Sequence, residues 1–268
     1  MELITFLIIG AVAGFAAGLF GVGGGTIMVP LLYIVFTQMG YSADTTMHLA
    51  LGTSLATIII TSISSLMAHN KNGAVMWPVF KNLAPGMALG CFFGAGIAGW
   101  LSGTHLQIIV GLFLLWVAFT MLTGGQKRVE ANASRSLPST PKQLGAGAAI
   151  GVASAIFGIG GGSLTVPYLN RYGVIMQKAV GTSAACGLPI AIAGALGFML
   201  FGMNEQVDVP NAIGYVHIYA FLGIGIMSFF TAKLGAKAAH ALSPQILKKC
   251  FAWLLVIVSV FFLFKALS

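Results

Sequence analysis

The pattern of apolar and polar positions divides the chain into long apolar runs separated by short polar turns. Six of these runs are about as long as the ~20 residues that a spanning helix needs. They do not alternate apolar with polar residues, as the strands of a membrane barrel do. We therefore expect an all-α polytopic membrane protein. The six expected crossings are residues 48–68, 83–101, 105–123, 179–201, 217–238 and 246–266.

Two further apolar segments are each interrupted by three consecutive glycines. The first has arms at 3–20 and 26–38, and the second has arms at 144–157 and 163–173. Most of these arms are too short to cross the hydrocarbon core alone. We therefore expect each pair of arms to form a broken re-entrant hairpin that enters and leaves on the same side.

The second half of the chain repeats motifs of the first half in the same order. The sequence at 18–30, which contains the first glycine triplet, recurs at 155–167. Gly-Thr-Ser at 52–54 recurs at 181–183, and Gly-x-Val at 73–75 recurs at 214–216. Three ordered blocks indicate a duplication. We expect a first transmembrane repeat at 1–123, a linker at 124–143 and a second transmembrane repeat at 144–268.

Charge favours opposite orientations for the two repeats. If each hairpin re-enters and each half crosses three times, every basic residue except Lys265 falls on one face, and four of the five acids fall on the other. Four crossings per half would scatter the basic residues over both faces. Because Lys and Arg collect in cytoplasmic loops, the first arrangement is favoured. The expected fold is two inverted-topology repeats, each a broken re-entrant hairpin plus three transmembrane helices, with a cytoplasmic linker.

Composition agrees with a lipid environment: 58% of the residues are hydrophobic and 7% are charged. Soluble chains carry about 25% charged residues. Because topology accounts for the net charge of +8, we expect no nucleic-acid partner. The three cysteines are far apart and indicate neither disulfides nor a metal site. The apolar run at 3–20 recurs in the second half, so we interpret it as part of the fold rather than a signal peptide.

The glycine triplets are candidate anion sites. Non-helical backbone at membrane depth must be buried in protein or line a water-filled cavity. Each triplet precedes a hydroxyl residue and a helical arm, an arrangement that presents free N–H groups and a positive helix end. Close helix packing is the alternative role for such glycines. A nucleotide loop is disfavoured because no Gly-Lys-Ser/Thr follows. The candidate residues are Gly23, Gly24, Gly25 and Thr26, and Gly160, Gly161, Gly162 and Ser163.

The Gly-Thr-Ser motifs supply a second set of candidates: Thr53, Ser54, Thr182 and Ser183. Their hydroxyls are suited to oxygen atoms of a ligand, although such hydroxyls also bond to carbonyls of their own helix. Asp44 and the five histidines fall at or near expected segment ends, where an interfacial role is more common than proton relay.

These motifs resemble the TauE/SafE family of sulfite and organosulfonate exporters (the YfcA-like membrane permeases). The resemblance rests on the glycine motifs at 13–30 and 153–167, the two Gly-Thr-Ser motifs, and His69, Gly73, Val75 and Trp77 at their spacing. It covers nearly the whole chain. It implies export of sulfite, sulfoacetate or related sulfur-containing anions across a bacterial inner membrane.

The expected function is secondary transport of small anions, bound between the two glycine-rich breaks near the midplane with alternating access. An anion channel, or a membrane assembly factor without coupled transport, is the alternative. The segments contain no arrangement typical of an enzyme. We expect no cofactor and no metal, with lipid, a small anion and a possible second copy of the chain as partners. Substrate identity, direction and coupling ion are left open by the sequence.

Overall fold

The computed structural model describes residues 2–20, 25–123, 137–205, 209–241 and 244–267. Over these ranges the chain is helical apart from one short hairpin, which confirms the all-α expectation. The described helices are α1 (Glu2–Phe20), α2 (Gly25–Gln38), α3 (Ala43–Lys71), α4 (Trp77–Trp100), α5 (Gly103–Thr123), α6 (Thr140–Phe157), α7 (Gly162–Arg171), α8 (Met176–Asn204), α9 (Ile218–Ala241) and α10 (Pro244–Leu267). The hairpin pairs β1 (Ala212–Ile213) with β2 (Val216–His217).

Every expected apolar segment corresponds to a helix, but several helices start earlier or end later than the apolar runs. Helix α4 begins six residues early, at Trp77, and α3 begins at Ala43 rather than at residue 48. The side chain of Ser42 accepts a hydrogen bond from the N–H of Thr45 at 3.2 Å, so Ser42 caps α3. Asp44 and His48 therefore lie in the first two turns of this helix.

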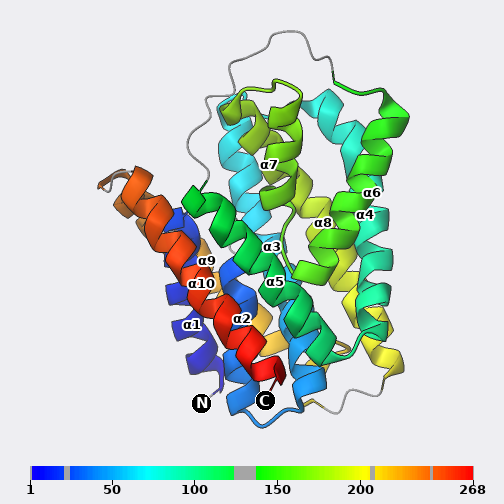
Figure 1. The fold of residues 1–268 in the computed structure, drawn as a ribbon, viewed down its shortest axis with the longest axis vertical. Helices are drawn as coiled ribbons and strands as arrows, with labels where there is room; N and C mark the ends of the chain where they lie inside the picture. The colour runs from blue at the N-terminus through cyan, green and yellow to red at the C-terminus, as the bar shows by residue number, and fades with distance from the viewer. Residues whose placement is uncertain (1, 21–24, 124–136, 206–208, 242–243, 268) are drawn as a thin grey trace.

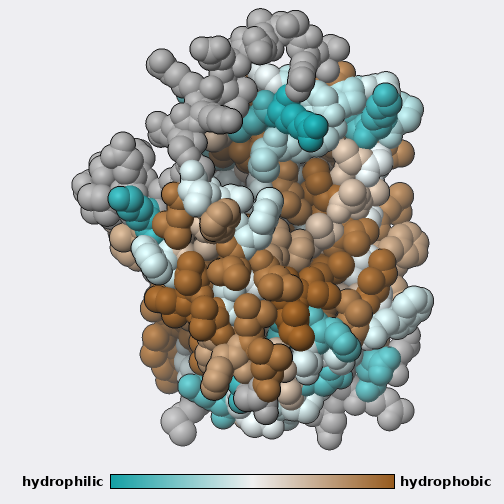
Figure 2. All heavy atoms as spheres, in the orientation of Figure 1, coloured by the Kyte–Doolittle hydropathy of each residue, from teal (hydrophilic) through white to brown (hydrophobic). Residues whose placement is uncertain are grey.

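Five described helices are long and apolar enough to cross a membrane: α3, α4, α5, most of α8 and the Lys249–Leu267 part of α10. Apolar side chains also cover the outside of the molecule. Figure 2 shows a hydrophobic band around the middle of one face, with polar residues toward both ends. Trp116 and Phe119 of α5 and Ile257 and Phe264 of α10 are among the exposed apolar residues. The chain is a multi-pass membrane protein.

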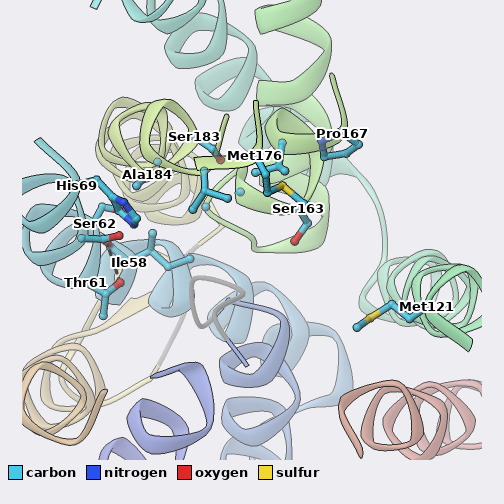
Figure 3. A pocket seen from close by; sticks show the side chains of 16 residues that line it. Ile58, Thr61, Ser62, His69, Met121, Ser163, Pro167, Met176, Ser183 and Ala184 are labelled. Atoms are coloured by element: carbon cyan, nitrogen blue, oxygen red, sulfur yellow. Dashed lines mark hydrogen bonds between the residues drawn. The ribbon is translucent and has the colours of Figure 1, made fainter. Parts of the chain in front are cut away.

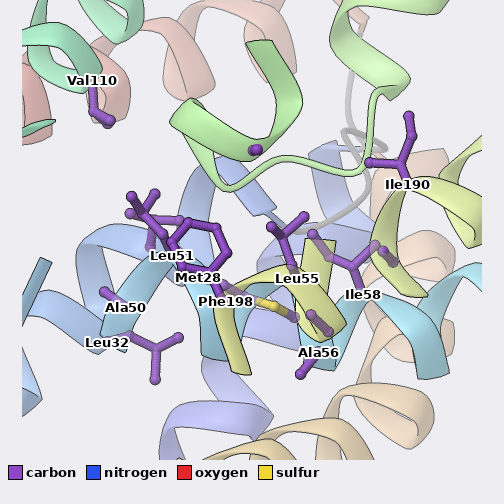
Figure 4. Packing of buried hydrophobic residues seen from close by; sticks show 14 of the residues in the cluster. Met28, Leu32, Ala50, Leu51, Leu55, Ala56, Ile58, Val110, Ile190 and Phe198 are labelled. Atoms are coloured by element: carbon purple, nitrogen blue, oxygen red, sulfur yellow. The ribbon is translucent and has the colours of Figure 1, made fainter. Parts of the chain in front are cut away.

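The helices run between two ends of the molecule (Figure 1). We call the end where α1 begins and α10 finishes the terminal end, and the end where α6 begins the linker end. Helix α3 runs from the terminal end to the linker end, and α8 runs back. The core lies where they meet. Met28, Leu51, Leu55 and Phe198 pack there and are at most 1% exposed (Figure 4).

Two helix pairs approach unusually closely through small residues. Helix α1 packs along α9, and α6 packs along α4. A methyl group added to Gly10 would lie 2.7 Å from Cα of Ile224, and one added to Gly147 would lie 2.5 Å from the carbonyl oxygen of Leu83. Such contacts leave room for no side chain. Small residues therefore set the helix spacing, as is usual between membrane helices.

Candidate functional site

The second glycine triplet forms a sharp break between α6 and α7. Helix α6 ends at Phe157 and is capped by Gly158, which is left-handed with φ 63°. Helix α7 follows Gly161, which has φ 72°. Glycine adopts this conformation without the strain that a side chain would bring. The carbonyl of Gly161 accepts N–H groups from Leu164 and Thr165. A helix leaves its first N–H groups without intrahelical acceptors, so those of Gly162 and Ser163 are available at this end.

The two breaks lie against each other. Gly25 starts α2 and is buried, and a methyl group added to it would lie 2.7 Å from the carbonyl oxygen of Gly158 and 2.9 Å from Cα of Ile159. Thr26 is also buried, at 3% exposed. Gly23 and Gly24 lie outside the described residues. For the described part of the first triplet, the structure therefore places the two breaks side by side.

A cavity of about 490 Å³ opens beside the second break. Gly160, Gly162 and Ser163 line it on one side, and Ser183 lines it from α8. Figure 3 shows Ser62 and His69 of α3 on one side of this space and Ser163 and Pro167 of α7 on another. Four of the sequence-predicted site residues thus share one cavity.

Sequence reasoning missed the α3 wall of this cavity. Ile58, Ser62, Ser65 and His69 line it at intervals of three or four residues, which places them on one face of the helix. A run of serines at helical spacing within an apolar membrane segment was a usable signal for these residues. In the sequence His69 was noted as an interfacial residue and as part of the family resemblance, but not as a site residue.

Buried hydroxyls converge on the start of α7 without partners of their own. The Oγ atoms of Ser154 and Ser183 and Oγ1 of Thr165 accept or donate no hydrogen bond within the described residues. A methyl group on Gly161 would lie 3.6 Å from Ser154 Oγ and 3.7 Å from Thr165 Oγ1, and one on Gly162 would lie 3.7 Å from Ser183 Oγ. Because unpaired buried hydroxyls are costly, their grouping at one helix start is typical of a ligand site.

The electrostatics of the cavity favour an anion. None of its 16 lining residues is Asp, Glu, Lys or Arg, and His69 is the titratable group among them. Exposed Lys71 and Lys178 follow lining residues His69 and Met176 by two positions. Exposed basic residues so close in sequence to the lining raise the local concentration of anions, and the α7 dipole presents its positive end inside.

Three other predicted site residues bond to the backbone. Thr53 Oγ1 accepts the N–H of His217 at 3.0 Å, and Thr182 Oγ1 accepts the N–H of Met76 at 3.0 Å. Ser54 Oγ donates to the carbonyl of Gly158 at 3.0 Å. The cavity lining does not include these three residues. Each of these bonds joins residues from the two halves of the sequence.

We expect Thr53→Val and Thr182→Val to lower the thermal stability of the purified protein. Each valine leaves a backbone N–H without its acceptor, at a cost of about 1–3 kcal/mol. Thermal unfolding followed by intrinsic fluorescence measures the effect. Thr120→Val is the matched control, because its exposed hydroxyl donates within its own helix to the carbonyl of Val117. Unchanged stability in both variants, with a loss of anion affinity, would instead place these hydroxyls on the ligand.

Known proteins resemble this chain over almost its whole length. The family model "Sulfite exporter TauE/SafE" matches residues 6–262. A "Probable membrane transporter protein" of Haemophilus influenzae is 37% identical over 254 residues, 95% of each chain. A "Probable membrane transporter protein" of Methanocaldococcus jannaschii is 28% identical, over 96% of this chain and 94% of its own. The "Probable inner membrane transporter protein TsaS" of Comamonas testosteroni is 23% identical, over 74% of this chain and 78% of its own. No solved structure gave a significant match.

Proposed function

Because the chain belongs to the TauE/SafE sulfite exporter family of membrane transporters, we propose that it is a secondary transporter of small anions. Sulfite, sulfoacetate and other organosulfonates are the proposed substrates. The anion binds at the second glycine break and is exchanged between the two sides of a bacterial inner membrane by alternating access. The observation that carries this proposal is the cavity in which the start of α7 meets the unpaired hydroxyl of Ser183.

The chemistry of this cavity suits an oxyanion. Two N–H groups and several hydroxyls supply donors, each worth about 1.5–3 kcal/mol toward a charged group. A partly buried helix start adds up to about 2 kcal/mol. Without a Lys or Arg in the lining, net affinity stays modest. We expect dissociation constants from micromolar to millimolar, which lets a carrier release its substrate.

The inverted-repeat arrangement is part of this proposal, with repeats at 1–123 and 144–268 joined by a linker at 124–143. Equivalent helices make equivalent contacts, since α1 packs on α9 as α6 packs on α4. The repeated motifs make Thr182 the equivalent of Thr53 and His217 the equivalent of Met76. Each threonine accepts a hydrogen bond from a backbone N–H in the other half, so the two bonds are equivalent. Such reciprocity is expected of two repeats around a pseudo-two-fold axis.

Equivalent residues at the two breaks differ in exposure, which supports alternating access. Ser163 lines the cavity, whereas Thr26, its equivalent, is 3% exposed and its Oγ1 has no hydrogen-bond partner in the described part of the chain. A site open at one break and shut at the other is what one state of an inverted-repeat carrier presents. In the opposite state Thr26 would line the open side.

Purified protein in liposomes tests the function. Loaded vesicles should show saturable uptake and counterflow with sulfite or an organosulfonate, and little with a cation or a zwitterion. Saturable counterflow separates a carrier from a channel. Flux that never saturates would indicate a channel, and absence of flux for every anion in a panel including acetate and phosphate would favour an assembly factor.

We expect Ser183→Ala to weaken transport of the same anion. Loss of one hydroxyl that bonds a charged ligand costs about 1.5–3 kcal/mol, roughly 10- to 100-fold in the half-saturating concentration. Ser139→Ala is the control, because Ser139 is exposed and its side chain makes no capping bond. Equal transport by both variants would place the anion elsewhere.

A further inference from the structure

A charged clamp lies at the terminal end, away from the cavity. Asp44 and His48 are one helical turn apart at the start of α3, so they share a face. The carboxylate of Asp44 accepts the N–H of Gly103, the first residue of α5. The ring of His48 reaches Ala98, in the last turn of α4. Two side chains on one face of α3 thus bond to the chain on both sides of the turn between α4 and α5.

Both ring nitrogens of His48 face carbonyl oxygens. Nδ1 lies 2.8 Å from the carbonyl of Asp44, and Nε2 lies 2.9 Å from the carbonyl of Ala98. A carbonyl oxygen only accepts, and a neutral imidazole has a single N–H. In the neutral ring one lone pair would therefore face a carbonyl at hydrogen-bond distance. The imidazolium form donates to both, so this geometry fits a ring that holds a second proton.

The helix ends favour the same charges. The carbonyl of Ala98 also accepts the N–H of Leu101 at the end of α4, where the helix dipole is negative and attracts a cation. The start of α5 is positive and carries the Asp44 carboxylate at Gly103. A protonated His48 places a positive charge at the negative end of α4, and Asp44 places a negative charge at the positive end of α5.

His48 is buried against an aromatic ring of the hairpin. It is 2% exposed and stacks on Tyr215, with ring centroids 4.7 Å apart. Burial, with the nearby carboxylates of Glu205 and Asp44, raises the pKa of Tyr215 to about 12, so its phenol stays neutral. The ring of His217, in the same hairpin, lies with Phe6 and Phe36.

Other titratable groups near the α4–α5 turn are accounted for. His105, in the first turn of α5, is exposed and its Nδ1 lies 2.6 Å from Ser102 Oγ. The described last turn of α4 carries no acidic or basic side chain. The carboxylate of Asp44 lies on the same face of α3 as His48 and has the charge opposite to that of an imidazolium ring.

The clamp and the cavity lie at different levels of α3. Cavity residues on α3 begin at Ile58, ten residues or about 15 Å beyond His48. The residue equivalent to His48 in the second half, by the spacing of Thr53 and Thr182, is exposed Gln177. The linker end therefore lacks this histidine, and the clamp belongs to the terminal end alone.

We propose that His48 is a proton-binding site whose charged form ties α3 to the α4–α5 turn and holds the terminal end closed. Loss of the proton removes one of the two hydrogen bonds and releases this end. The opening of the terminal side then depends on whether this ring holds its second proton. The gating role rests on the proposed transport function, whereas the proton site does not.

Nitrogen NMR of purified protein with ¹⁵N-labelled histidine tests the proton site without any substrate. The His48 signals, identified by their loss in His48→Gln, should show two protonated ring nitrogens at pH 6. If that variant does not fold, His69→Gln, His105→Gln, His217→Gln and His240→Gln identify the remaining signals by elimination. A single neutral tautomer from pH 5 to 8 would overturn the proposal.

Thiol labelling from the terminal side tests the gate. A cysteine replaces buried Ala50 in a Cys250→Ser background, and its rate of reaction with a membrane-impermeant methanethiosulfonate is compared with that of a cysteine at exposed Asn211. This ratio cancels the intrinsic rise in thiolate with pH. We expect this ratio to rise at least 5-fold from pH 5.5 to 8 in the parent. In His48→Gln the ratio should be high at both pH values and should not change between them. The control His105→Gln should behave like the parent.

The gating role would be overturned if the labelling ratio of the parent did not change with pH while NMR showed a protonated His48. Neither measurement requires transport. An absence of anion flux in liposomes would therefore refute the proposed function while the NMR and labelling results still decide the clamp.

Discussion

Gly161→Val should abolish transport while the protein remains in the membrane. Gly161 has φ 72°, a conformation in which a β-branched residue is strained, and its added side chain would overlap Cδ1 of Ile190. The start of α7 must then shift, and a displacement of about 1 Å at a binding site can cost ~100-fold in rate. We expect at least a 100-fold loss in liposome transport, with membrane levels followed by immunoblot.

Gly145→Val is the matched control for this result. Gly145 lies in α6, and a methyl group added to it would meet nothing within 4 Å. This variant should keep near-normal transport. If Gly161→Val transports equally well, the second break serves helix packing and the site lies elsewhere.

The second prediction with a large expected effect concerns which end of the molecule faces the cytoplasm. A cysteine at Asn72 should be protected from an impermeant thiol reagent added outside intact cells, and one at Asn211 should react. Asn72 follows Lys71 at the linker end, where Lys81, Lys142, Arg171 and Lys178 also lie near helix ends. Basic residues collect on the cytoplasmic side, so this end should face the cytoplasm.

The two sites are matched because both are exposed and both lie between elements. Permeabilised cells provide the control, since both cysteines should then react. The reverse pattern would contradict the proposed orientation, and labelling of both sites in intact cells would contradict opposite placement of the two ends. Native Cys91 and Cys186 are buried, which keeps the background low once Cys250 is replaced.

Much of the fold was predictable because membrane helices leave a strong local signal. Each expected segment is a helix, since lipid requires runs of apolar residues and internally satisfied backbone. The hairpin at Ala212–His217 was not expected, because two strands of two residues leave no periodic pattern. The start of α3 was missed because its first turn is polar.

The candidate site was predictable in part. Consecutive glycines signal a helix break, and Ser163, next to the second triplet, lines the cavity together with Ser183 of the second Gly-Thr-Ser motif. The partners of Thr53 and Thr182 were not foreseeable, since they are backbone groups more than 100 residues away. Ser154 and Thr165 were missed because only the turn at Gly161 brings their hydroxyls together.

The packing of α1 on α9 and of α6 on α4 has a consequence for biosynthesis. Helices α1 and α6 each pack on a helix from the other half of the chain. Ile218, the first residue of α9, is translated 198 residues after Phe20, the last of α1. Helix α1 therefore stays without this partner until nearly the whole chain has left the ribosome. During that time the backbone around Gly10 and Gly14 is exposed to lipid. A ribosome that stalls after α5 leaves a half-protein in which α1 lacks α9, the helix along which it packs.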